Sequence, residues 1–228
     1  MRSFPESIKG IIFDLDGTIV DRDRLVVHCT REVAKKLFGK PPNQNQIPWG
    51  LHETDTIRKL ALQASGDLSE RALDIYKRCL HANLKMVEVF PGMRDLLERL
   101  RKSNTPLALV TSIPDSSVVN AVLERVQVKH WFKTVVTGED VKRPKPDPEG
   151  VQLALQGLSL SQSVVLMVGD SAADIQAGRK AGVVTGAALW GLKDLRDLWG
   201  PLASRARPDF KFQTVAELDR LLFRGLIR

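Results

Sequence analysis

The stretch Lys9-Gly10-Ile11-Ile12-Phe13-Asp14-Leu15-Asp16-Gly17-Thr18 decides how the rest of the chain is interpreted. Its apolar run, 11–13, is β-branched or aromatic, which is typical of a strand buried on both faces of a parallel sheet. The strand ends at Asp14 and Asp16, where the carboxyl ends of parallel strands face the ligand crevice. Two carboxylates this close repel each other unless a cation lies between them or one keeps its proton. The stretch therefore predicts a chemical site, although Asp-Gly also forms ordinary turns.

Length and composition place the chain among folded globular proteins with a substantial core. It has 228 residues, 25.4 kDa and 43% hydrophobic residues, enough for one large domain or a core with a smaller insert. The net charge is +7 and the pI about 9.6, which would suit nucleic acid or small anions. The basic residues form no dense block and no aromatic residues alternate with them. We therefore expect a field that attracts small anions, and no nucleic-acid partner.

Three further expectations concern the cellular setting. The longest apolar run, 164–168, is far shorter than the roughly 18 residues of a membrane span, so we expect no membrane association. Residues 1–7 hold no apolar segment of the kind found in signal peptides, which predicts a cytoplasmic protein. Cys29 and Cys79 are the only two cysteines, and we expect two buried thiols rather than a disulfide.

The periodicity of apolar residues changes twice along the chain. Residues 20–88 repeat at three- and four-residue spacing, which predicts an all-helical insert, and Gly39 ends its first helix. From Phe90 onward helices alternate with strands, which predicts an α/β fold with a doubly wound, parallel, Rossmann-like sheet. We expect an α/β core of residues 1–19 and 89–228, with a helical cap of residues 20–88. The predicted later strands are 107–111, 134–136, 164–168 and 183–188, with helices at 93–102, 116–124, 148–155, 172–181 and from 214.

Polar residues follow three of the predicted later elements. Thr111 and Ser112 end one strand, where they could bind an anion or simply begin a turn. Lys145 lies between two prolines in the loop 142–149, which would present its ammonium from a stiff backbone or leave a solvated basic loop. Asp170 follows the strand 164–168, and Asp174 comes one helical turn later, so both can face one point or cap the helix.

Taken in order, these residues resemble the motifs of the haloacid dehalogenase-like superfamily, in its phosphatase branch. Asp14-Leu15-Asp16-Gly17-Thr18 is similar to the family's first motif and Thr111-Ser112 to its second. Lys145-Pro146-x-Pro148-Glu149 resembles the third motif and Gly169-Asp170-Ser171-x-x-Asp174 the fourth. The resemblance covers nearly the whole chain, including a helical cap like that of phosphoglycolate phosphatases and β-phosphoglucomutase-like proteins. Trp190-Gly191 also resembles a segment of phosphoglycolate phosphatases.

The resemblance implies an enzyme that hydrolyses a small phosphate monoester with Mg²⁺. Asp14 would take the phosphoryl group as an aspartyl-phosphate, and Asp16 would act as general acid and then as general base. Thr111, Ser112 and Lys145 would bind the phosphoryl oxygens. The Mg²⁺ ligands implied are Asp14, the Asp16 carbonyl, Asp170 and Asp174.

Specificity would lie in the cap loop, where Gly50 permits close approach and His52 either contacts the substrate or begins a helix in solvent. Substrates would be small phosphorylated molecules such as phosphoglycolate, a sugar phosphate or a nucleotide, and the chain would be a monomer or homodimer.

Other activities of the superfamily fit the residues less well. Hydrolytic dehalogenases lack the second acid, so Asp16 argues against them. Sugar phosphomutases are an alternative, but they carry a histidine where this chain has Val26. A non-catalytic anion-binding protein is a further alternative, although it would have no need of every motif residue. Arg22 stands where relatives often have a small hydroxyl residue.

Overall fold

Strand β1, Gly10–Phe13, lies in the middle of a six-stranded parallel sheet. The computed structural model describes residues 8–39, 53–63, 68–191 and 207–223. The strand order is β5-β4-β1-β6-β7-β8, and every pair of neighbours is parallel. This confirms the predicted α/β class with a parallel, Rossmann-like sheet. The other strands are β4 Leu107–Val110, β5 Phe132–Val136, β6 Val165–Gly169, β7 Val184–Ala188 and β8 Phe210–Phe212.

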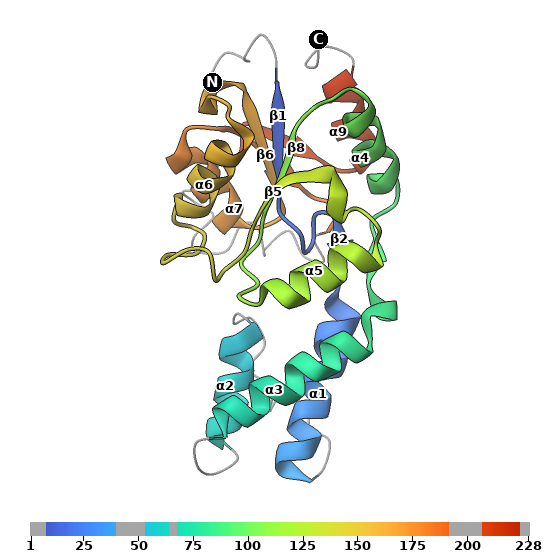
Figure 1. Cartoon of the computed structure of the whole chain (residues 1–228), viewed down its shortest axis with the longest axis vertical. Coiled ribbons are helices and arrows are strands. Elements are labelled where there is room, and N and C mark those ends of the chain that lie inside the picture. The colour runs from blue at the N-terminus through green and yellow to red at the C-terminus, as the bar shows by residue number, and fades with distance from the viewer. Residues whose placement is uncertain (1–7, 40–52, 64–67, 192–206, 224–228) are drawn as a thin grey trace. The chain divides into compact units, whose positions relative to one another are not determined.

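Helices cover both faces of this sheet, as a doubly wound fold requires. In Figure 1, α6 and α7 lie on one side of the strands and α4 and α9 on the other. All four residues of β1 are buried, which explains why its apolar run does not alternate with polar residues. The helices are α4 Met93–Lys102, α5 Ser116–Arg125, α6 Glu149–Leu158, α7 Ala172–Ala181 and α9 Val215–Leu221, with short 3₁₀ helices η3 Lys129–Trp131 and η4 Gln162–Val164.

Two strand features were not predicted. A short antiparallel pair, β2 Val20–Asp21 and β3 Glu88–Val89, joins the two ends of the insert that we expected to be all helical. Strand β8 adds an edge to the sheet beside β7. Both escaped prediction because two or three residues are too few to show a period.

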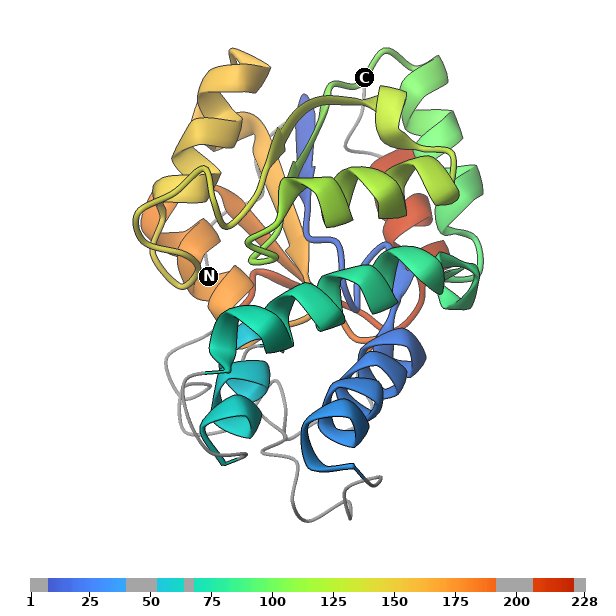
Figure 2. The same ribbon diagram turned by 60° about the horizontal axis from the view of Figure 1, so that its bottom comes forward.

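The chain divides into two compact units. The core unit comprises Met1–Asp21 with Glu88–Arg228, and the helical unit comprises Arg22–Val87. The helical unit contains α1 Asp23–Phe38, α2 Glu53–Gln63, α3 Ser69–Ala82 and the 3₁₀ helix η2 Leu84–Met86, with its three α-helices visible in Figure 2. Gly39, with φ of 71°, ends α1 as predicted. Within the described residues, we find no helix both long and apolar enough to cross a membrane.

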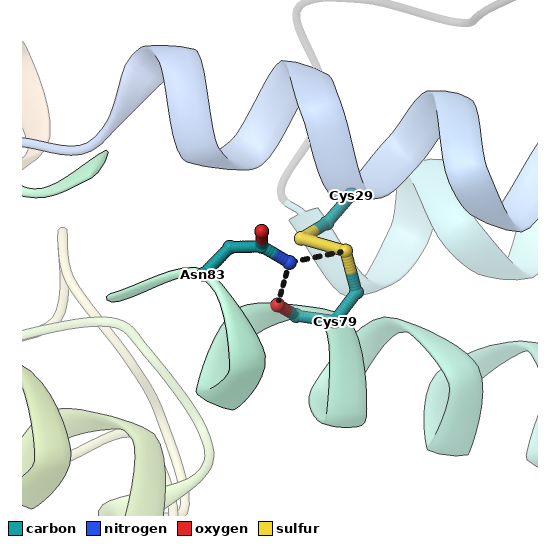
Figure 3. The surroundings of a disulfide bond; sticks show 3 residues. All are labelled: Cys29, Cys79 and Asn83. Atoms are coloured by element: carbon teal, nitrogen blue, oxygen red, sulfur yellow. Dashed lines mark hydrogen bonds between the residues drawn. A yellow bond between two sulfur atoms is a disulfide. The ribbon is translucent and has the colours of Figure 1, made fainter. Parts of the chain in front are cut away.

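The expectation of two free thiols is wrong, because Cys29 of α1 and Cys79 of α3 form a disulfide (Figure 3). Helix α3 packs against α1, and this packing places the two Cα atoms 5.5 Å apart, within the range that a disulfide needs. Asn83 donates from Nδ2 to the Cys79 carbonyl at 2.9 Å and lies 3.6 Å from the Cys79 Sγ. Cysteines 50 residues apart reveal their pairing only through the packing of the helices that carry them.

Candidate active site

The order of the strands brings the motif residues to one edge of the sheet. β1 lies between β4 and β6, and Phe13 is level with Leu109 on one side and Val168 on the other. Asp14, the next residue, continues the ladder by donating its backbone N–H to the Val168 carbonyl at 2.9 Å. The chain segments that follow β1, β4 and β6 therefore start from the same rim.

Three carboxylates meet at this rim. Asp14, Asp170 and Asp174 each place one oxygen within 4.8 Å of the others. Asp14 and Asp174 are almost fully buried, and Asp170 is half-buried. Each comes from a different point of the fold: the end of β1, the end of β6 and the first turn of α7. Sequence reasoning placed all three at the site, and the structure brings them together.

Gly17 allows the first motif to approach Asp170. Its φ is +73°, a left-handed conformation that disfavours side chains. A Cβ on this residue would also lie 2.1 Å from Asp170 Oδ2. Asp16 precedes this turn and is half-buried, and it forms an isolated β-bridge with Val20. The glycine is thus required both for the backbone conformation and for space.

The Lys145 ammonium neutralises part of this acidic cluster. Nζ donates to Asp14 Oδ1 at 2.5 Å, to Asp174 Oδ1 at 2.6 Å and to the Val110 carbonyl at 3.0 Å. The lysine side chain is only 6% exposed, so these bonds form away from bulk water. The alternative of a solvated basic loop is therefore excluded for Lys145.

Two acids that sequence reasoning did not single out for this purpose hold the lysine in place. The Glu149 carboxylate accepts from the backbone N–H groups of Lys142 and Arg143 at 3.0 and 3.2 Å, which fastens the loop to the start of α6. Asp174 uses its second oxygen in a capping box with Ser171, accepting the backbone N–H at 3.0 Å and the hydroxyl at 2.5 Å. Asp174 thus joins the helix start to the lysine.

The carboxylates of this cluster carry more negative charge than the single Lys145 ammonium can neutralise. Burial raises the pKa of Asp14 to about 7, and repulsion from Asp174 adds to the effect while Lys145 opposes it. Burial and the neighbouring carboxylates also raise the pKa of Asp170 well above its ordinary range. Burial alone would lower the pKa of Lys145. The negative charges of Asp14 and Asp174 outweigh this effect and raise the pKa, so the lysine stays charged. Three carboxylates against one ammonium leave an excess of two negative charges when all are ionised.

This excess is what a divalent cation would balance. Carboxylate and carbonyl oxygens are the ligands that hard cations such as Mg²⁺ prefer. The oxygen donor set, its spacing and the raised carboxyl pKa values together fit a metal of this kind. The acidic cluster is therefore compatible with a divalent metal site.

The predicted phosphate-binding residues lie partly within the described structure. Thr111 is buried just past β4, and its Oγ1 accepts the Ile113 backbone N–H at 3.2 Å, which leaves the hydroxyl proton for another acceptor. Ser112 follows it and is half-buried. Gly50 and His52 lie outside the described residues.

A further residue touches the first motif without a predicted role. The Trp190 indole Nε1 donates to the Thr18 carbonyl at 2.9 Å, across 172 positions of sequence. Gly191 lies against Gly17, because a Cβ at 191 would fall 1.9 Å from the Gly17 carbonyl oxygen. The only sequence signal was the family resemblance of Trp190-Gly191, which said nothing about its contacts.

Comparison with known proteins agrees with this geometry. Residues 11–188 match the family model of the haloacid dehalogenase-like hydrolases. Pyrophosphatase PpaX of Oceanobacillus iheyensis is 30% identical over 93% of this chain and 95% of its own length. A phosphoglycolate phosphatase of Pseudomonas syringae is 31% identical over 80% of this chain and 70% of its own.

The fold agrees as well. A crystal structure of a HAD-superfamily hydrolase, subfamily IA, from Geobacter sulfurreducens superimposes with a TM-score of 0.72 at 23% identity, covering 97% of this chain and all of that one. By sequence and by fold, the chain belongs to the haloacid dehalogenase-like hydrolases, in their phosphatase branch.

Proposed function

We propose that this protein hydrolyses small phosphate monoesters through an aspartyl-phosphate on Asp14, with Mg²⁺ as cofactor. The observation that carries the proposal is the Asp14 carboxylate at the sheet rim, 2.5 Å from the Lys145 ammonium and clustered with Asp170 and Asp174. A nucleophilic carboxylate, a fixed cation and further acids for a metal are the parts that phosphoryl transfer needs.

The reaction would proceed in two displacements. In the first, an Asp14 carboxylate oxygen bonds to phosphorus, the ester oxygen leaves with its electron pair, and Asp16 gives that oxygen a proton. In the second, Asp16 takes a proton from water while the water oxygen bonds to phosphorus and the Asp14–phosphorus bond breaks. The products are the alcohol and inorganic phosphate, and both acids return to their starting states.

The remaining motif residues would position the phosphoryl group. Lys145, Thr111 and Ser112 would bind its oxygens, and Lys145 would also reduce the repulsion between the anion and Asp14. Asp14, Asp170 and the Asp16 carbonyl would hold Mg²⁺, with Asp174 binding it or ordering its water. When bound, the metal would neutralise charge on the phosphoryl oxygens.

The helical unit, residues 22–87, would be the cap that selects the substrate, with Gly50 and His52 in its specificity loop. The curated relatives above are named as acting on pyrophosphate and phosphoglycolate. Phosphoglycolate, sugar phosphates, nucleotides and pyrophosphate therefore form the substrate panel.

The test is release of inorganic phosphate from this panel with Mg²⁺ or with excess EDTA. We expect Mg²⁺-dependent release that Asp14→Asn abolishes, because an amide does not replace the nucleophile. Asp95→Asn, which changes an exposed acid in α4, is the matched control and should keep full activity. Undiminished release by Asp14→Asn, or release that EDTA leaves unchanged, would refute the proposal. An isomerised sugar phosphate without free phosphate would instead identify a phosphomutase.

A further inference from the structure

We propose that Trp190 is a positioning residue that holds the turn carrying Asp16, and so sets how well Asp16 protonates the leaving group. This inference rests on the proposed role of Asp16 as general acid. Its structural basis is the hydrogen bond from the Trp190 indole Nε1 to the Thr18 carbonyl, at 2.9 Å. Trp190 is half-buried, so this hydrogen bond is partly shielded from water.

A second contact from the same segment reaches the same turn. At Gly191 a Cβ would lie 1.9 Å from the Gly17 carbonyl oxygen, 2.6 Å from its carbon and 2.8 Å from its Cα. Such close approach means that the backbone at 191 lies directly on the peptide after Gly17. The segment 190–191 therefore fastens the turn by a hydrogen bond and by backbone packing.

The same turn also lies against the acidic cluster. A Cβ on Gly17 would lie 2.1 Å from Asp170 Oδ2, so Gly17 is close to both Asp170 and Gly191. Backbone bonds from Gly17 N–H to the Val20 carbonyl at 2.9 Å, and from Ile19 N–H to the Leu15 carbonyl at 2.9 Å, close the turn on itself. The bond from Trp190 ties the Thr18 peptide of this turn to a distant part of the core unit, and the Phe90 backbone N–H ties the next residue by donating to the Ile19 carbonyl at 3.1 Å.

The position of this turn matters because Asp16 immediately precedes Gly17. A general acid must lie within hydrogen-bond reach of the oxygen that it protonates, and a displacement of about 1 Å can cost about a hundredfold in rate. Loosening the turn should therefore impair proton donation by Asp16, while Asp14 stays fixed at the end of the buried strand β1.

Proton donation is needed to different degrees by different substrates. An alkyl phosphate releases a strongly basic alkoxide unless a proton arrives with the bond cleavage. A nitrophenyl phosphate releases a stable phenolate and needs no such proton. The value of kcat/KM reports steps up to the first irreversible one, here the phosphorylation of Asp14, so it isolates the acid role of Asp16 from its later base role.

The experiment compares an alkyl phosphate with 4-nitrophenyl phosphate in the Mg²⁺-loaded, full-length enzyme. Trp190→Phe keeps an aromatic ring and removes the N–H donor. We expect kcat/KM for the alkyl ester to fall by about tenfold, with less than about a twofold change for the nitrophenyl ester. Gly191→Ala should act in the same direction through the second contact. Trp131→Phe, in η3, is the matched control and should change neither value.

The outcomes separate this proposal from the proposed function. An equal loss on both esters in Trp190→Phe, or no loss on either, would overturn the positioning role. Asp16→Asn should show the larger loss on the alkyl ester. If Asp16→Asn affects both esters equally, the assignment of Asp16 as general acid fails, and the inference about Trp190 fails with it.

Discussion

Breaking the disulfide between Cys29 and Cys79 is expected to destabilise the helical unit by about 4 kcal/mol. The bond closes a loop of about 50 residues that includes all of α2 and most of α1 and α3. In the chain-entropy treatment a cross-link stabilises the fold by restricting the unfolded chain, and a loop of this length corresponds to about 4 kcal/mol. An energy of this size changes an unfolding equilibrium constant by about a thousandfold.

Hydrogen exchange on the full-length protein can measure this change where it occurs. Amides of α1 and α3 should exchange up to about a thousandfold faster after reduction, because their protection depends on opening of the helical unit. Amides of β1 and β6, in the core unit, should be unaffected and serve as the internal control. In the double variant Cys29→Ala/Cys79→Ala, the amides of α1 and α3 should exchange equally fast with and without reductant.

Equal exchange of α1 and α3 in oxidised and reduced protein would refute the reasoning, provided that thiol titration shows the bond to be broken. Thiol titration of protein isolated under a blocking reagent also tests the expected cellular setting. Disulfides persist in oxidising compartments and are rare in the cytosol, so a cross-linked protein and a cytoplasmic one are competing expectations. Two blocked thiols would favour the cytoplasm. A protein with no blocked thiol would favour an oxidising compartment.

The remaining predictions concern the metal site and the packing of glycines. Because burial raises the pKa of Asp14 to about 7, the metal-free folded protein holds a proton that the unfolded chain releases, so its stability should fall as pH rises from about 4 to about 7. In EDTA the melting temperature should therefore fall more over this pH range for wild type than for Asp14→Asn. Mg²⁺ should raise the melting temperature of wild type more at pH 7 than at pH 5. Parallel plots of melting temperature against pH for the two proteins would contradict this. Gly17→Ala should remove phosphate release while the protein stays folded by circular dichroism, since it combines a φ of +73° with a clash at Asp170; near-normal activity would contradict the geometry. Gly157→Ala should lower the free energy of unfolding by about 1–3 kcal/mol in urea titrations, because its Cβ would lie 2.0 Å from Thr134 Oγ1. Thr134→Ala in the same chain should recover part of that loss, and additive effects would disprove the clash.

Local patterns in the sequence were sufficient to predict the fold class and to place the candidate acids Asp14 and Asp170 at one edge of the sheet. The apolar run of β1 and the alternation after Phe90 each span enough residues to show a period, and they predicted the parallel sheet. Asp14 and Asp170 were found because strand ends of a parallel sheet gather at one rim, whereas Lys145, in the loop before α6, was singled out by the family resemblance. The resemblance of these motifs to the haloacid dehalogenase-like superfamily implied a phosphate substrate and a divalent cation.

Tertiary packing decided what no local pattern encodes. Whether Cys29 and Cys79 bond depends on how two helices meet, and sequence periodicity says which face of a helix is buried but not which helix covers it. The contact of Trp190 with Thr18, and the bond of Asp174 to Lys145, likewise join residues that are distant in the chain. The sequence by itself determined which residues lie at the strand ends, because short-range propensities act within a single strand or helix. The folded backbone decided which side chains hold those residues in place, because distances between elements exist only after packing.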